Sequence, residues 1–167
     1  MRSLEKTVRS VREEETLKEG LRVYNLFVVL ASLYAFVYIM LSLLQKDILL
    51  ALKMACVLFV PFALVTVLRY AVRAPRPYDL FGIGHPFGKE KCSSHGAFPS
   101  RHVFSAALLG TALLAVSPLF GGILLALAVL LAVDRVLLGF HFPRDVVAGY
   151  LIGIFAGAIG LSVIHFL

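Results

Sequence analysis

The stretch LRVYNLFVVLASLYAFVYIMLSLL, residues 21–44, decides the fold class of this chain. It is a run of 24 residues in which the only charge is Arg22. An α-helix of that length is about 36 Å long, enough to cross the roughly 30 Å hydrocarbon core of a bilayer. The sequence therefore predicts a transmembrane helix here.

Four further apolar segments follow, at residues 48–68, 103–117, 119–133 and 146–167. Hydrophobic residues make up 60% of the 167 positions and charged residues only 16%, which is atypical of a soluble domain. Two of the segments, 103–117 and 119–133, are short and reach spanning length only with flanking polar residues. We expect an all-α, polytopic bundle of about five transmembrane helices, forming one integral membrane domain over residues 21–167.

The first twenty residues predict a different kind of helix. They contain five basic and five acidic side chains, with Leu4, Val8 and Val11 at helical spacing. This pattern is typical of an amphipathic helix lying on the membrane surface, and we assign it residues 1–20. The acidic residues are foreign to a signal peptide, so residues 21–44 are expected to persist as an anchor.

One long polar connection, residues 69–101, carries six basic residues against two acidic ones, a net charge of +4 out of +6 for the chain. Such a charge indicates an anionic partner at one membrane face. With five crossings, this loop, the connection 134–145 and the N-terminus emerge on the same face. The sequence offers no groove-reading helix or stacking platform, so nucleic acid is not expected as a partner.

The first polar cluster is RYAVRAPRP, residues 69–77, with two arginines seven positions apart. The guanidiniums of Arg69 and Arg76 can grip a phosphate bidentately. Basic residues at a helix end are also common as plain membrane anchors.

The second cluster is FPSRH, residues 98–102. With Pro99 at the first helical position, the amides of the next three residues would point outward and form an anion site. The same pattern is also typical of an ordinary helix start.

The third cluster is DRVLLGFHFPRD, residues 134–145. The spacing of four brings His141 close to Asp145, and a carboxylate on one ring nitrogen leaves the other nitrogen available as a nucleophile or base. The alternative is an interfacial ion pair with an aspartate that stabilises a helix N-terminus.

Together the clusters resemble the signature of the type 2 phosphatidic acid phosphatases, lipid phosphate phosphatases that share a helical core with vanadium haloperoxidases. The family pattern is Lys or Arg, six residues, Arg-Pro; then Pro-Ser-Gly-His; then Ser-Arg, five residues, His, three residues, Asp. Two positions depart from it: Arg101 replaces glycine, and Asp134, which we expect to pair with Arg135 or another arginine, replaces serine. The matching positions are Arg69, Arg76, Pro77, Pro99, Ser100, His102, Arg135, His141 and Asp145.

The resemblance implies a hydrolase that removes phosphate from a lipid phosphate without a metal or cofactor. In that scheme His141 attacks phosphorus to form a phosphohistidine, and Asp145 holds its ring. His102 protonates the leaving oxygen and then activates water. The phosphate-binding residues implied are Arg69, Arg76, Ser100, Arg101 and Arg135.

The substrate implied is a lipid, because only about twenty residues, 78–98, are available to cover the site. Phosphatidic acid, phosphatidylglycerophosphate, a polyprenyl phosphate or diphosphate and a lipid A phosphate all fit. A non-catalytic protein that binds or transports anionic lipids is the alternative, but binding alone needs the arginines and not the oriented histidines. A haloperoxidase would not need the membrane spans.

The remaining expectations concern assembly and location. Gly149, Gly153 and Gly157 form a small-residue ridge that either packs within the chain or mediates a homodimer. All the lysines and arginines except Lys46 and Lys53 fall on the polar face, which by the positive-inside rule favours a cytosolic active site in the cell membrane. The assignment inverts if residues 1–20 cross the bilayer.

The cysteines carry little information. Cys56 lies inside a predicted helix and Cys92 in the long loop, so a disulfide between them is not expected. His85, Cys92 and His95 lack a fourth ligand, and we therefore expect no metal site.

Overall fold

The computed structural model describes residues 1–88 and 96–166, and within them the regular secondary structure is entirely helical. The all-α fold predicted from the sequence is confirmed. In chain order the helices are α1 (Arg2–Glu13), α2 (Glu15–Leu44), α3 (Ile48–Val72), α4 (Pro77–Leu80), α5 (Arg101–Leu114), α6 (Pro118–Leu137) and α7 (Pro143–Phe166).

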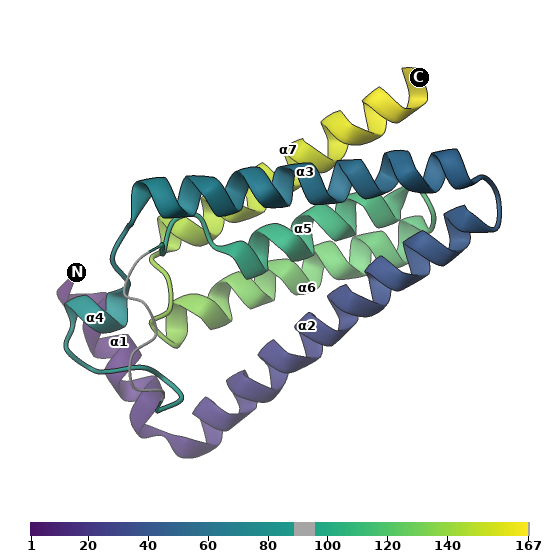
Figure 1. Ribbon diagram of the computed structural model, residues 1–167. Coiled ribbons are helices and arrows are strands. Elements are labelled where there is room, and N and C mark those ends of the chain that lie inside the picture. The colour runs from purple at the N-terminus through teal and green to yellow at the C-terminus, as the bar shows by residue number, and fades with distance from the viewer. Residues whose placement is uncertain (89–95, 167) are drawn as a thin grey trace.

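The five long helices α2, α3, α5, α6 and α7 run back and forth in an elongated bundle (Figure 1). Helix α5 is its centre, since it packs against α2, α3, α6 and α7. Most of its residues are buried, among them the small residues Ala106, Ala107 and Gly110. Small side chains allow neighbouring helices to approach closely where no hydrophobic effect drives them together.

Within residues 1–88 and 96–166, four helical segments are long and apolar enough to cross a membrane: residues 15–44, 48–80, 118–137 and 143–164. Their outer faces carry large exposed apolar side chains, such as Tyr34, Leu52 and Phe155. The protein is therefore an integral membrane protein. The fifth apolar segment is α5, whose 14 residues extend about 21 Å and fall short of the bilayer core.

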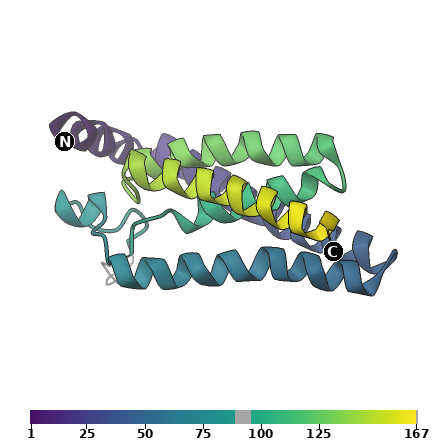
Figure 2. The ribbon, with the colours of Figure 1, turned by 90° about the horizontal axis from the view of Figure 1, so that it is seen from above.

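The polar parts of the chain gather at one end of the bundle. The N-terminus, α4 and the connection between α6 and α7 lie there, whereas the C-terminus and the α2–α3 and α5–α6 connections lie at the other end (Figures 1 and 2). This arrangement agrees with the expectation that the three polar clusters share one face.

Helix α1 packs its apolar side against the protein. Val8 and Val11 are buried, and Val8 lies against Gly139 in the turn between α6 and α7. Arg9 donates to the carbonyl of Phe81 at 3.0 Å, and Arg12 donates to that of Gly84 at 3.0 Å. The helix thus holds the segment after α4 in place.

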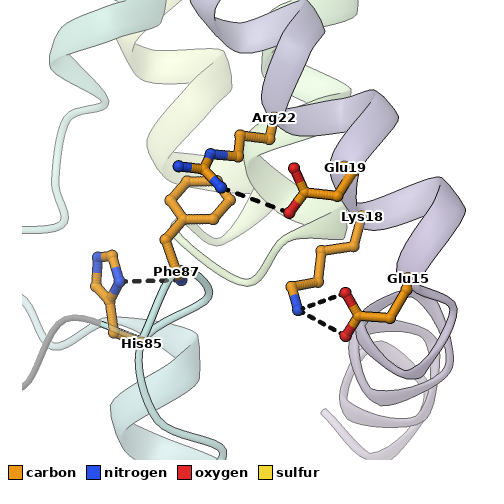
Figure 3. Close-up of polar contacts among 6 residues, drawn as sticks. All are labelled: Glu15, Lys18, Glu19, Arg22, His85 and Phe87. Carbon is orange, nitrogen blue, oxygen red and sulfur yellow. Dashed lines mark hydrogen bonds and ion pairs between the residues drawn. The ribbon is translucent and has the colours of Figure 1, made fainter.

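Helix α2 begins at Glu15, so residues 15–20 extend the membrane helix and do not belong to a separate surface helix. The i,i+3 ion pairs Lys18–Glu15, at 2.9 Å, and Arg22–Glu19, at 3.5 Å, lie along this extension (Figure 3). Pairs at this spacing support a solvent-exposed helical turn.

The glycine ridge of α7 is occupied by α5 of the same chain. A Cβ atom added at Gly149 would lie 2.6 Å from the carbonyl oxygen of Ser100, and one at Gly153 would lie 2.6 Å from that of Phe104. One at Gly157 would lie 2.8 Å from Cβ of Thr111. The ridge packs within the chain, and a homodimer through these residues is unsupported.

We expect Gly149→Ala to destabilise the protein by about 1–3 kcal/mol, because the new methyl group would collide with backbone atoms, which cannot move away as a flexible side chain can. Thermal unfolding in detergent measures the effect. The matched control is Gly122→Ala on α6, where an added Cβ has no atom within 4 Å. An equal melting temperature for the two variants would contradict the role assigned to Gly149.

Candidate active site

The turn after α6 places two of the candidate residues. Gly139 has φ +76°, its amide donates to Val136, and the amide of Phe140 donates to the carbonyl of Arg135. This is a Schellman motif, which a glycine at that position favours. The amide of His141 also donates to the Arg135 carbonyl, at 3.2 Å, so the turn ties His141 to the end of α6.

Asp145 faces His141 from the first turn of α7. Its Oδ2 lies 3.9 Å from Nδ1 of His141, an ion-pair distance that is longer than a hydrogen bond. The same oxygen accepts from the amide of Phe142 at 2.9 Å, which caps α7. The predicted proximity is present, and both side chains are buried, with 3% of His141 and none of Asp145 exposed.

His102 lies in the first turn of α5 and contacts Arg135. Nη2 of Arg135 is 2.8 Å from Nδ1 of His102. A guanidinium only donates, so Nδ1 must accept, and the proton of a neutral ring then resides on Nε2. The second and third clusters of the sequence therefore meet through a direct hydrogen bond.

Ser100 joins α5 to α7. Its amide donates to the carbonyl of Asp145 at 2.9 Å, and the close approach of Gly149 makes room for this contact. The helix begins at Arg101, with Ser100 as its N-cap and Pro99 outside the helix. The expectation of three outward amides is thus wrong for Ser100, because the neighbouring helix already uses its amide.

The arginines are held by backbone and by aromatic rings. Arg69, near the end of α3, donates to the carbonyl of Pro99. The guanidinium of Arg76 lies 5.7 Å from the ring centre of Tyr78, and that of Arg135 lies 4.6 Å from that of Phe140. Cation–π contacts of this kind fix a guanidinium without neutralising it.

Several buried polar atoms at this place have no hydrogen-bond partner within the part of the chain that the structure describes. They include two guanidinium donors, a hydroxyl and a ring nitrogen. Buried polar groups are normally satisfied, so such a group of orphaned atoms indicates a ligand site. The atoms are Nε of Arg76, Nε of Arg135, Oγ of Ser100 and Nδ1 of His141.

Asp134 does not form the ion pair that the sequence predicted. Its side chain is buried, with 1% exposed, and its carboxylate forms no ion pair with Arg135 among the described residues. Consecutive positions of a helix point about 100° apart, which separates the two side chains. The ion pair expected with Arg135 or another arginine is therefore absent among the described residues.

Arg101 lies near Arg69 and His102, and its charge acts on both. It is exposed, and its guanidinium lies 5.9 Å from the ring centre of Phe62 on α3. It lines a cavity of about 360 Å³ that also reaches His102. The cavity is formed by α2, α3, α5 and α6, and its lining residues are Val28, Val29, Ser32, Phe62, Arg101, His102, Ser105 and Leu131.

Sequence reasoning missed the aromatic residues that hold the arginines and the cavity wall on α2. Tyr78 and Phe140 are each one or two positions from a matched motif residue. Their closeness to the motifs in the sequence could therefore have identified them as neighbours of the site. Val28, Val29 and Ser32 belong to an ordinary apolar helix. Nothing in their spacing distinguishes a cavity wall from a lipid-facing surface.

Burial and positive charge act together on His141. Burial lowers the pKa of His141 well below its ordinary value of 6.5, and the charges of Arg135, Arg76 and Arg69 lower it further. A contact with the backbone of Ala97 opposes the shift. The ring is therefore neutral at physiological pH, which is the state required of a nucleophile.

Among the described residues, no three His, Cys, Asp or Glu side chains are grouped so as to hold a metal ion. Cys92 and His95, part of the set weighed for zinc, lie outside the described residues. Cys56 is a free, exposed thiol.

Comparisons with known proteins agree with the geometry. The PAP2 superfamily model matches residues 50–166, a range that contains every candidate site residue. The crystal structure of Aquifex aeolicus LpxE is similar, with a TM-score of 0.69, 24% identity, and coverage of 94% of this chain and 93% of that chain. No curated protein sequence matches.

A second similar structure is the first transmembrane PAP2 type phosphatidylglycerolphosphate phosphatase from Bacillus subtilis. Its TM-score is 0.66 at 20% identity, and the alignment covers 99% of this chain and 86% of that chain. At these identities both structures establish a common fold.

The lowered pKa of His141 predicts a pH dependence of stability. As the pH falls below 6.5, the unfolded chain binds a proton at this residue before the folded protein does, so the folded state loses up to about 1.4 kcal/mol per pH unit. We expect the melting temperature of the wild type to fall more between pH 7.5 and pH 5.5 than the melting temperature of His141→Gln. Parallel pH profiles would contradict a buried neutral ring.

Proposed function

The chain belongs to the PAP2 superfamily, and on that premise we propose that it is a membrane-embedded phosphatase that acts on a lipid phosphate. The observation that carries the proposal is the convergence of orphaned donors on the histidine pair. Arg76, Arg135 and Ser100 each present a buried donor without a partner among the described residues. A phosphate offers the acceptor oxygens that such donors require.

We propose that phosphate binding falls to Arg69, Arg76, Ser100, Arg101 and Arg135. The positive charge of the arginines replaces what a metal ion supplies in other phosphoryl-transfer sites, namely stabilisation of charge on the equatorial oxygens. Aromatic contacts fix two of these guanidiniums before substrate binds. Preorganised donors stabilise a transition state without reorganisation at the moment of reaction.

In the first step a neutral ring nitrogen of His141 attacks phosphorus. The phosphorus–nitrogen bond forms as the bond to the leaving oxygen breaks, giving a phosphohistidine. Asp145, 3.9 Å from Nδ1, stabilises the positive charge that develops on the ring. The carboxylate is itself held by the amide of Phe142, so its position does not depend on substrate.

His102 acts on the leaving oxygen. Without phosphate its Nδ1 is occupied by Arg135, so a full proton transfer requires that Arg135 turn to the phosphate. Nδ1 can then bind a proton from solution, and the cationic ring gives its Nε2 proton to the leaving oxygen. Binding of phosphate thus converts His102 into an acid.

The second step is hydrolysis of the phosphohistidine. Neutral His102 accepts a proton from water at Nε2 while the water oxygen attacks phosphorus. The phosphorus–nitrogen bond breaks, inorganic phosphate leaves, and His141 is restored as a neutral ring. Release of the Nδ1 proton to solution then returns His102 to its starting neutral state.

The cavity beside His102 favours a lipid substrate. Its wall combines apolar side chains of α2, α3 and α6 with the polar residues Arg101, His102 and Ser105 of α5, and it lies between membrane-spanning helices. The Bacillus subtilis neighbour is itself a phosphatidylglycerolphosphate phosphatase. Phosphatidic acid, phosphatidylglycerophosphate, polyprenyl phosphates and lipid A phosphates remain the substrate candidates.

We expect purified protein in detergent to release phosphate from lipid phosphates with EDTA present. His141→Ala removes the nucleophile and should lower kcat by about 10³-fold or more, and Asp145→Asn should lower it by a smaller factor. The control is Arg73→Gln, an exposed arginine at the end of α3. Undiminished release by His141→Ala would overturn the mechanism, and no release from any lipid would favour a non-catalytic lipid-binding protein.

We propose that the active site faces the cytosol, as the distribution of basic residues predicts. Single cysteines at Lys6 and Lys46, introduced after Cys56 and Cys92 are replaced by serine, lie at opposite ends of the bundle. A membrane-impermeant maleimide applied to intact cells should label position 46 only. Labelling of position 6 instead would invert the assignment.

A further inference from the structure

The turn between α6 and α7 carries the proposed nucleophile. The amide of His141 donates to the carbonyl of Arg135 at 3.2 Å, which joins the nucleophile to the end of α6. The carbonyl of Gly139 accepts from the amide of Tyr78 at 3.1 Å, which joins the turn to α4. The position of the His141 ring therefore depends on how firmly this turn is held.

Helix α1 packs against the same turn with the side chain of Val8. This valine is completely buried. A Cβ atom added at Gly139 would lie 2.9 Å from Cγ1 of Val8 and 4.0 Å from Cβ of Tyr78. Gly139 has φ +76°, which glycine adopts readily, and because it has no side chain Val8 rests directly on its backbone. The turn is thus held between α1 and α4.

A second contact from α1 reaches the chain on the other side of the nucleophile. Arg9, the residue after Val8, donates to the carbonyl of Phe81 at 3.0 Å. The ring of Phe81 meets the ring of Phe142 edge-on, with the ring centres 6.4 Å apart. Phe142 directly follows His141 in the chain. Two adjacent residues of α1 therefore support the backbone before and after His141.

This support matters because the reacting ring needs a defined position. Nδ1 of His141 lies 3.9 Å from Oδ2 of Asp145, beyond hydrogen-bond distance, so this contact alone does not fix the ring. A misplacement of about 1 Å at a reacting group can lower a rate by about 100-fold. The packing of α1 against the turn supplies the restraint that the contact between the two side chains lacks.

We propose that Val8 is a positioning residue for the nucleophile: from α1 it holds the backbone at Gly139, and through it the ring of His141, in place to attack phosphorus. The inference rests on the proposed phosphatase function. It places a determinant of the reaction rate outside the range that the PAP2 superfamily model matches, because that range begins at residue 50.

The test measures release of phosphate in detergent from phosphatidic acid, or from farnesyl phosphate if the wild type hydrolyses that lipid faster. We expect Val8→Ala to lower kcat by about tenfold or more and to change KM by less than about threefold. The two lost methyl groups support the nucleophile and do not contact the phosphate. Val8→Ile keeps the branched side chain, and its kcat should stay within about threefold of the wild type.

The matched control is Val11→Ala. Val11 is the other buried valine of α1, but its atoms are not the nearest ones to an added Cβ at Gly139. The same two methyl groups are lost in this variant, so its melting temperature should fall about as far as that of Val8→Ala. Its kcat should stay within about twofold of the wild type.

A double variant tests the contact itself. Gly139→Ala places a methyl group against Cγ1 of Val8 and should lower kcat, because the turn must move to make room. Val8→Ala removes that carbon. The double variant should therefore be more active than Gly139→Ala alone, although the strain of a positive φ at alanine remains.

Equal losses of kcat in Val8→Ala and Val11→Ala would overturn the inference, because they would reduce Val8 to a packing residue of α1. Unchanged kcat in Val8→Ala would also overturn it, as would a double variant less active than Gly139→Ala. None of these results would affect the proposed phosphatase activity, since the wild type would still release phosphate. Release from no lipid by the wild type would overturn the proposed function and, with it, this role of Val8.

Discussion

The hydrogen bond from the amide of Ser100 to the carbonyl of Asp145 holds the two halves of the polar site together. It fixes the start of α5, which carries His102, against the start of α7, which follows His141. The contact is possible only because α7 has glycine at 149, where any side chain would collide with backbone. Close packing of two membrane helices is thus the condition for the geometry of the site.

The guanidiniums of the site are held in place by contacts that do not neutralise their positive charge. Arg76 and Arg135 lie on aromatic rings, and their buried Nε atoms have no partner among the described residues. In a low-dielectric setting such donors bind an anion far more strongly than they would in water. The same charges, together with burial, keep the pKa of His141 low and its ring neutral. One arrangement therefore serves both parts of the proposed function, the binding of phosphate and the preparation of the nucleophile.

The sequence predicted the helical class from the length of its hydrophobic runs and the common face of the polar clusters from the number of membrane crossings. It predicted the proximity of His141 to Asp145 from their i,i+4 spacing. Each of these features can be read directly along the chain. It could not predict that α7 uses the Ser100 amide, since that bond joins residues 45 positions apart. It also misjudged Asp134, because neighbouring positions of a helix diverge in direction. The contact of Arg101 with the ring of Phe62 joins two different helices and could not be predicted from the sequence either.

The shortness of α5 has a consequence for which phosphates can be reached. At about 21 Å it is roughly 9 Å shorter than the hydrocarbon core, and its first turn begins well inside the level at which α3 ends (Figure 1). On the proposed function, the reacting phosphate is therefore carried below the level at which α3 ends, at a cost in dehydration that an attached hydrophobic chain offsets. Sugar phosphates and nucleotides have no such chain. The proposed preference for lipid phosphates over water-soluble phosphate esters is thus expected from this depth alone, before any contact with the polar side chains.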